Sequence, residues 1–219
     1  MMDAILAEIG LYGPGFLKAS WTVLWLTVLT IVVSWICGLA AALARASSVV
    51  PFQATARFYI WFMRGTPALI QIFIIYFGLP QLGVRLSPYT AGILALGINS
   101  GAYVAEIVRS GLSAIPRGQT ESALALGLDR REIMRSIILP QVFRIIVPPV
   151  TNEAITTLKN TSLLSTITVL ELTLYAQTLI AATFRPFEFY IAVAVIYLVL
   201  TTILSQLAGW LERHYARLS

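Results

Sequence analysis

Charged residues are scarce in this chain of 219 residues, since Asp, Glu, Lys and Arg together make up only 11% of it. Soluble globular domains carry about 25% charged residues, so the composition excludes that class. The mean hydropathy of +0.82 is instead typical of a membrane protein that crosses the bilayer several times. The net charge of +5 does not indicate binding to nucleic acid, because the basic residues flank apolar segments.

Residues that usually carry chemistry are also rare. The single cysteine, Cys37, lies in an apolar run, which excludes a disulfide within the chain and favours a buried structural thiol. One cysteine and the single histidine, His214, are too few for a tetrahedral metal site. The chain has no Gly-x-x-x-x-Gly-Lys phosphate-binding loop and no visible nucleophile–base–acid set. We therefore expect no metal, no ATP bound by this chain and no enzymatic activity.

Long apolar runs are abundant in the chain. A membrane-spanning helix needs about 20 mostly apolar residues. The runs 19–44, 65–84, 86–105 and 189–211 meet this requirement. The run 136–158 is interrupted by Arg144, Glu153 and three prolines, and 160–184 contains Glu171. The sequence thus predicts an all-α, polytopic integral membrane protein.

The positions of the basic residues predict the orientation and the number of spans. Asp3, Glu8 and Lys18 precede the first span, whereas Arg213 and Arg217 follow the last. By the positive-inside rule the N-terminus lies outside and the C-terminus in the cytoplasm, which requires an odd number of spans. We expect about five, at 19–44, 52–79 with an interruption at 64–67, 88–112, 137–158 and 188–211, with residues 1–18 as an outer amphipathic lead. Residues 160–184 would not cross but would form a short helix and loops near the outer surface. No linker divides the chain, so 1–219 is expected to form one transmembrane domain, and the first span is not a cleavable signal peptide.

The segment 121–140 is charged and amphipathic, although it lies between apolar spans. It predicts two short helices separated by Gly127, at a position where helices commonly end in a left-handed residue. Asp129 is then a helix N-cap, and Glu132, three residues later, would complete a capping box. A loop of this kind, at about 113–136, is suited to contact a partner outside the bilayer.

This loop carries a resemblance to a known family. The matching positions are Glu121, Ala123, Gly127, Ile137, Leu139 and Pro140. They fit the E-A-A-x-x-x-G and I-x-L-P pattern of ABC importer permeases, with Ser122 in place of the usual alanine. The resemblance implies that the loop is a cytoplasmic coupling helix that docks on an ATPase. It also implies that Glu121, Ala123 and Gly127 serve this coupling. Arg130 and Arg131 could add contacts, although arginines collect in any cytoplasmic loop.

Four further segments resemble the polar amino acid uptake subfamily of these permeases. They are RGTP at 64–67 followed by Gln71, YFGLP at 76–80, NSGAY at 99–103 and KNTSL at 159–163. The resemblance implies a type I importer permease in a bacterial inner membrane, working by alternating access. Its expected partners are two ATPase subunits that bind ATP and Mg, a second permease chain, identical or similar, and an extracytoplasmic amino-acid-binding protein. The expected substrate is a polar amino acid, and Glu153 favours a cationic one such as arginine, lysine or histidine.

Glu153 is the first candidate for the substrate path, because an ionisable group at membrane depth usually faces a cavity or a partner. Asn152 lies beside it, and Pro148-Pro149 should distort the helix so that freed backbone groups line a cavity. Glu153 could bind a substrate ammonium or a cationic side chain. Alternatively, it pairs with Lys159 or with a neighbouring subunit.

Other polar residues of the spans are candidates for the same path. They are Gln71, Tyr76, Asn99 and Tyr103. Glu106 and Arg109, three residues apart, should form a structural ion pair, and the glycines near Asn99 should allow close helix packing. A channel or secondary transporter without an ATPase is the alternative function. It accounts for the spans but leaves the loop at 121–140 without a role.

Overall fold

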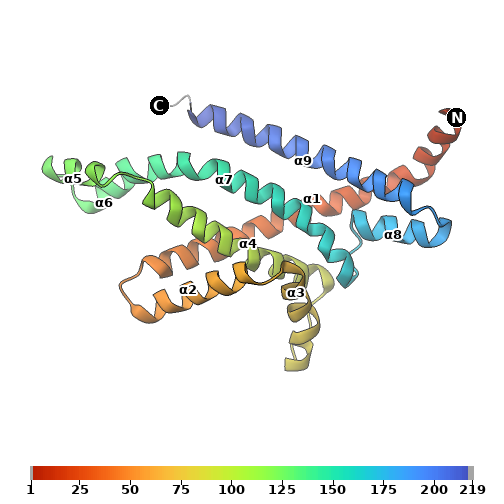
Figure 1. The fold of residues 1–219 in the computed structure, drawn as a ribbon, viewed down its shortest axis with the longest axis horizontal. Helices are drawn as coiled ribbons and strands as arrows, with labels where there is room; N and C mark the ends of the chain where they lie inside the picture. Colours follow the sequence, from red (N-terminus) through yellow and green to blue (C-terminus); the bar gives the residue numbers. More distant parts are fainter. Residues whose placement is uncertain (1, 217–219) are drawn as a thin grey trace.

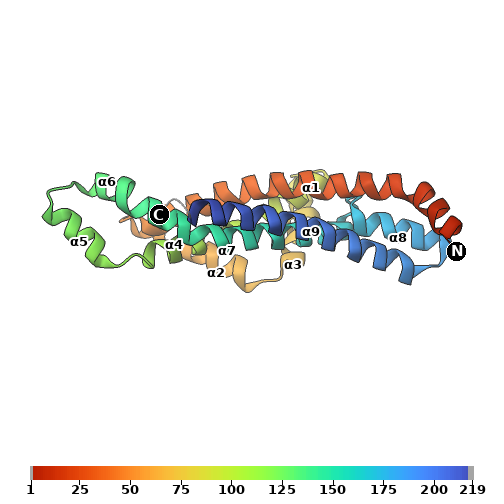
Figure 2. The ribbon, with the colours of Figure 1, turned by 90° about the horizontal axis from the view of Figure 1, so that it is seen from above.

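The computed structural model describes residues 2–216, and every regular element in this range is a helix. Most of the helices run along one long axis and form a thin slab, from which the segment Ala68–Leu82 projects (Figures 1 and 2). The short helices α5 and α6 lie at one end of this axis, near the C-terminus, whereas α8 and the N-terminus lie at the other end. The side chains of Asp3 and His214, and all of Arg217, are outside the described part of the chain.

Four helical segments within residues 2–216 are long and apolar enough to cross a membrane: Gly10–Ala46, Pro88–Ser113, Arg130–Ile167 and Pro186–Trp210. They belong to α1 (Met2–Ala46), α4 (Pro88–Ser113), α7 (Leu139–Asn160) with its flanking turns, and α9 (Pro186–Ala216). A fifth span is formed by α2 (Val50–Gly65) and the segment Ala68–Leu82, which meet at a bend of 111°. Counting the bent pair as one span gives the five that the sequence predicts.

The bend lies where the Gly-Thr-Pro sequence predicts an interruption. The helix α3 (Ala68–Phe73) starts directly after Pro67, and the π-helical η1 (Ile74–Gly78) and the 3-10 turn η2 (Leu79–Leu82) continue it. Gln71 Nε2 donates to the Met63 carbonyl at 2.9 Å and to Thr66 Oγ1 at 2.7 Å. Asn99 Nδ2 donates to Gln71 Oε1 at 3.0 Å. These bonds satisfy polar groups that the break would otherwise leave unpaired in an apolar surrounding.

The first helix begins earlier than predicted. The sequence predicts a separate amphipathic segment over residues 1–18, but α1 is continuous from Met2 and passes through Pro14. Aromatic packing holds this part of the helix: the ring of Tyr12 lies edge-on to Phe189, and Phe16 lies edge-on to Tyr175. Tertiary contacts with α8 and α9 thus extend the helix where the local sequence pattern predicts only an amphipathic lead.

The glycines of α4 allow α1 to approach closely, as predicted. A Cβ atom added at Gly97 would lie 2.6 Å from Cγ1 of Val33, and one added at Gly101 would lie 2.8 Å from Cβ of Cys37. Both distances are shorter than real contacts allow, so only glycine fits at these two positions. Small residues at such contacts are the usual basis of helix packing in lipid, where no hydrophobic force drives association.

The segment after α7 does not cross the slab, in agreement with the prediction. It forms the 3-10 helix η4 (Thr161–Ile167) and α8 (Leu172–Thr183), which packs on α9. Glu171 is fully buried and caps α8, accepting hydrogen bonds from the backbone N–H of Thr173 and of Leu174 at 2.9 Å. The hydroxyl of Tyr197 on α9 donates to the same carboxylate at 2.9 Å. Burial raises the pKa of the Glu171 carboxyl, and these hydrogen bonds act in the opposite direction.

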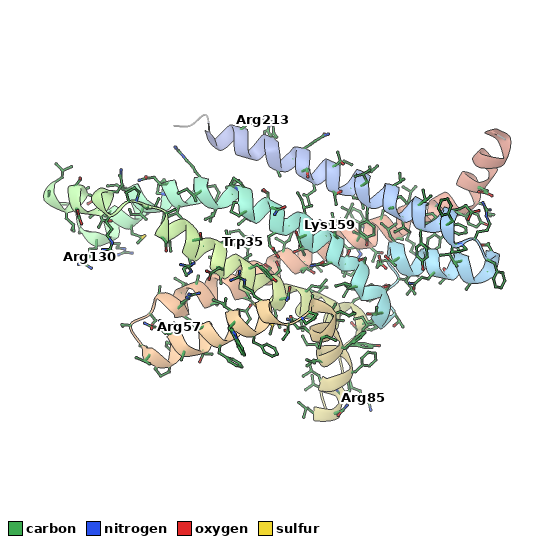
Figure 3. All side chains as sticks on the ribbon, in the orientation of Figure 1. Trp35, Arg57, Arg85, Arg130, Lys159 and Arg213 are labelled. Carbon is green, nitrogen blue, oxygen red and sulfur yellow. The ribbon has the colours of Figure 1, made fainter. Side chains whose placement is uncertain are left out.

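Basic side chains are distributed unevenly along the long axis. Figure 3 shows Arg57 and Arg130 toward the end that carries α5 and α6, and Arg85 in the other half, whereas Lys159 and Arg213 line one groove between α7 and α9. The positions of Arg57, Arg130 and Arg85 are compatible with the predicted five-span arrangement, whereas the groove that Lys159 and Arg213 share does not separate these two residues as that arrangement predicts.

Candidate functional site

The loop between α4 and α7 contains two short helices, α5 (Arg117–Ala125) and α6 (Arg130–Ile133), followed by the π-helical η3 (Met134–Ile138). Gly127 has φ +83° and separates the two helices, as predicted. The N–H of Gly127 donates to the Leu124 carbonyl at 3.0 Å, and the N–H of Leu128 donates to the Ala123 carbonyl at 3.2 Å. This bond pair is the Schellman motif, which needs a left-handed residue at the Gly127 position.

The cap of α6 is formed by Asp129, whose Oδ1 accepts from the N–H groups of Arg131 and Glu132 at 2.8 Å. The reciprocal bond of a capping box, from the Asp129 N–H to the Glu132 carboxylate, is not formed within the described residues. The predicted N-cap is thus confirmed, whereas only one of the two hydrogen bonds that define a capping box is present among the described residues.

The loop presents some of its predicted coupling residues outward and buries one. Glu121, Arg130 and Arg131 are exposed, and Leu126 is 81% exposed. Ala123 is only 3% exposed and packs in an apolar cluster with Ile133. Ala123 therefore packs the loop against the apolar cluster that contains Ile133. The exposed residues form the surface available to a partner.

A cavity of about 310 Å³ opens between α2, α4 and α7. Its polar lining comes from Arg64, Tyr103, Glu106, Ser110, Asn152 and Glu153. Of the six predicted path residues, three line it: Tyr103, Asn152 and Glu153. Half of the predicted path residues thus lie at one cavity, which is lined by α2, α4 and α7.

Glu153 is held by a chain of buried hydroxyl groups. Ser100 Oγ donates to Glu153 Oε1 at 2.8 Å. The hydroxyls of Ser34 and Thr157 donate to Ser100 Oγ at 3.1 and 3.3 Å. These two bonds occupy the lone pairs of Ser100 and direct its proton to the carboxylate. Within the described residues Oε2 of Glu153 has no partner, so this oxygen is available to a ligand in the cavity.

The alternative partner of Glu153, Lys159, lies elsewhere. Lys159 is exposed and lines a different groove, together with Arg213 on α9. The two residues are six positions apart on α7, which places them on different faces of the helix. No ion pair of Glu153 occurs among the described residues.

The helix α7 continues through Pro148 and Pro149, so the predicted distortion at these prolines is not a break. The π-helical turn instead directly precedes α7, whose second residue is Pro140. Since Pro149 has no N–H, the carbonyl of Ile145 lacks its usual helical donor. Ile145 and Pro149 both line the cavity, so this carbonyl lies on the side where Glu153 also faces.

Arg64 supplies the positive charge of the cavity. Its guanidinium lies over the ring of Tyr103, 5.4 Å from the centroid. The predicted pair of Glu106 and Arg109 is formed, with Arg109 Nε donating to Glu106 Oε1 at 2.8 Å. Arg45 joins it from α1, 2.8 Å from Glu106 Oε2. Glu106 is therefore neutralised within the protein, whereas Arg64 forms no direct ion pair among the described residues and interacts with Glu106 only at longer range.

The other predicted path residues have structural surroundings. Gln71 and Asn99 bond to each other and to the bend between α2 and α3, and they do not line the cavity. Tyr76 packs edge-on against Phe77, with ring centroids 4.8 Å apart. The sequence prediction missed Arg64 as a site residue, although a cation beside a Gly-Thr-Pro interruption within an apolar segment was a usable signal.

A model of the family described as "Binding-protein-dependent transport system inner membrane component" matches residues 30–217. The chain belongs to this family. The glutamine transport system permease protein GlnP of Escherichia coli is 41% identical over 202 residues, which cover 91% of this permease and 92% of GlnP. The arginine transport system permease protein ArtQ of Bacillus subtilis is 37% identical over 201 residues, with coverage of 91% and 92%. The octopine transport system permease protein OccM of Rhizobium radiobacter is 40% identical over 209 residues, with coverage of 89% and 85%.

Solved structures agree with this assignment. A crystal structure of an amino acid ABC transporter with histidines matches the permease with a TM-score of 0.90 and 40% identity, covering 95% of this chain and 97% of that one. The MetNI methionine ABC transporter has a TM-score of 0.78 at 18% identity, which shows a shared fold only. The permease is thus a transport subunit of an ABC importer in the inner membrane, and it acts with a separate ATPase and a binding protein. Membership of this family excludes the alternative of a channel or carrier that needs no ATPase.

Proposed function

We propose that the permease carries a polar α-amino acid through the cavity between α2, α4 and α7. The observation that supports this most directly is the carboxylate of Glu153. One of its oxygens is held by Ser100, the other has no partner among the described residues, and Glu153 lines the cavity. A half-buried carboxylate at membrane depth without an ion pair is costly, and a ligand cation would offset the cost.

The charges of the cavity match the two charges of an amino acid. Glu153 on α7 would accept hydrogen bonds from the substrate ammonium, while Arg64 on α2 would bind its carboxylate, a pairing for which the guanidinium fork is well suited. Asn152 and Tyr103 would contact the polar side chain. The relatives named above are permeases for glutamine, arginine and octopine. Each of these three substrates combines a positively charged nitrogen and a carboxylate with a polar side chain. A cationic side chain could take Glu153 as its partner instead of the ammonium.

The assembly would contain two permease chains, identical or similar, two ATPase subunits and one extracytoplasmic amino-acid-binding protein. ATP and Mg would be bound by the ATPases alone. The end of the slab that carries Arg57 and Arg130 would face the cytoplasm, and the N-terminus would lie outside. The exposed residues Glu121, Arg130 and Arg131 of the coupling loop would dock on the ATPase and transmit its motion, so that the cavity opens alternately to the two sides.

Uptake by the reconstituted complex tests this function. The permease is co-expressed with its partner ATPase, purified as a complex, and placed in vesicles with the binding protein and a panel of labelled amino acids. We expect ATP-dependent uptake of polar amino acids and none of leucine or phenylalanine. Uptake that continues without ATP, or co-purification without an ATPase, would contradict the proposal.

A further inference from the structure

A second hollow, of about 760 Å³, runs between α1 and α9, away from the transport cavity. Most of its lining is apolar or aromatic, from Phe16, Leu17, Trp21, Phe189, Val195 and Leu200. The side chain of Trp21 is 67% exposed, although it borders this groove. This hollow is thus an open apolar groove between two membrane-spanning helices.

Ionised groups border the groove at one end only. Arg185 Nη1 lies 2.7 Å from Glu8 Oε1, and Arg185 Nε lies 3.1 Å from Glu188 Oε1. Among the described side chains that line the groove, two carboxylates and one guanidinium leave a net charge of −1 at this end. Glu8 and Arg185 lie just outside the spans that begin at Gly10 and Pro186, so this end is at the membrane surface.

The length of the groove distinguishes between possible occupants. From Glu8 to Leu24 on α1 it extends about 24 Å, at a rise of 1.5 Å per residue. The hydrocarbon core of a bilayer is about 30 Å thick, so one leaflet contributes about half of that. The groove therefore covers a headgroup region and one leaflet. A spanning helix of a partner would need an apolar surface through both leaflets.

We propose that this groove binds one phospholipid with a primary-ammonium headgroup, of the phosphatidylethanolamine type. The acyl chains lie along Phe16, Trp21 and Leu200. The ammonium meets the carboxylates of Glu8 and Glu188, and the phosphate faces Arg185. An anionic headgroup without an ammonium would add negative charge to an end that already carries −1. The proposal does not depend on the substrate of the permease, and the proposed orientation determines only which leaflet supplies the lipid.

Fluorescence quenching by brominated lipids tests the proposal on the complex of permease and ATPase. The chain has five tryptophans, so the Trp21 signal is taken as the difference between the wild type and Trp21→Phe. Vesicles contain a small fraction of brominated phosphatidylethanolamine or, in parallel, of brominated phosphatidylglycerol. We expect Trp21 to be quenched about fivefold more effectively by the first lipid, the ratio for an exposed ion pair worth about 1 kcal/mol. The double variant of Glu8→Gln and Glu188→Gln should abolish the preference.

Two variants of α9 supply the steric test. Ala192→Phe fills the groove and should reduce quenching of Trp21 to the level that the bulk lipid fraction gives. Ala194→Phe adds the same ring to an exposed position outside the groove and should leave the quenching unchanged. Equal quenching by both lipids, or no effect of Ala192→Phe, would overturn the proposal. So would complete protection of Trp21 from both lipids, because another protein chain would then cover the groove.

Discussion

The hydroxyl of Ser100 on α4 donates a hydrogen bond of 2.8 Å to the carboxylate of Glu153 on α7, and it receives hydrogen bonds from Ser34 and Thr157. Three helices thus fix one oxygen of the carboxylate of Glu153, a residue that lines the cavity. A preorganised charge of this kind loses little conformational freedom when a ligand binds. This arrangement makes Glu153 the position at which the transport site is tested most directly.

Replacement of Glu153 by glutamine keeps the shape of the side chain and removes its charge. If Glu153 binds a substrate cation, we expect the apparent KM for uptake to rise tenfold or more, because a charge-assisted hydrogen bond worth roughly 1.5–3 kcal/mol is weakened. The yield of the complex with the ATPase should stay the same, since the docking loop is distant. Lys159→Gln, on the same helix but facing another groove, is the matched control. An unaltered KM for every transported amino acid would remove Glu153 from the site.

Substitution of Gly127 by valine tests the coupling loop. Gly127 has φ +83°, which a β-branched residue adopts only at a cost of about 1–2 kcal/mol, so the turn between α5 and α6 should be displaced. We expect the complex to lose substrate-stimulated ATP hydrolysis in vesicles while the chain still inserts in the membrane. Gly118→Val, in α5 and with open space around it, is the control and should retain stimulation. Full stimulation by Gly127→Val would count against the coupling role.

Glu171 is expected to stabilise the fold rather than to bind substrate. Its replacement by alanine removes the cap of α8 and leaves the hydroxyl of Tyr197 only the long contact of 3.4 Å with Thr161 Oγ1. We expect a loss of about 2–4 kcal/mol, from about 1 kcal/mol for the cap and 1–3 kcal/mol for the poorly paired buried group. Thermal unfolding in detergent measures this loss. Glu132→Ala removes an exposed carboxylate instead and should shift the midpoint much less. Similar midpoints for both variants would show that Glu171 adds no special stability.

Labelling of introduced cysteines tests the orientation, in a background in which Cys37 is replaced by serine. Ser48 and Gln119 are exposed at the end of the slab that is proposed to be cytoplasmic, whereas Gln81 is exposed in the turn after η1. In intact cells an impermeant thiol reagent should label a cysteine at Gln81 and should not reach one at Ser48 or Gln119. Labelling of the Gln119 position from outside would reverse the proposed orientation.

Local patterns allowed much of the fold to be predicted from the sequence. The spans follow from long apolar runs, and the turn of the coupling loop follows from Gly127 and Asp129, which act on their immediate neighbours. Contacts between distant residues could not be predicted in this way. Ser34 and Ser100 are 66 residues apart, and nothing near either of them indicates that they meet beside Glu153. Gln71 and Asn99 were predicted to line the path because polar groups in spans are often functional, but the bend uses their hydrogen bonds.

The contact between α1 and α4 at Gly97 and Gly101 has a mechanical consequence. No methyl group fits between the two helices at these points, so neither helix can slide along the other without a steric clash. We therefore expect α1 and α4 to move together as one rigid unit. Movement of the permease during its cycle would then have to occur elsewhere, and the 111° bend between α2 and Ala68–Leu82, which the hydrogen bonds of Gln71 and Asn99 hold, is a place where two segments of one span could change their angle. Arg64 lies directly before this bend, so rotation there would carry its charge toward or away from Glu153 and change the distance across the cavity.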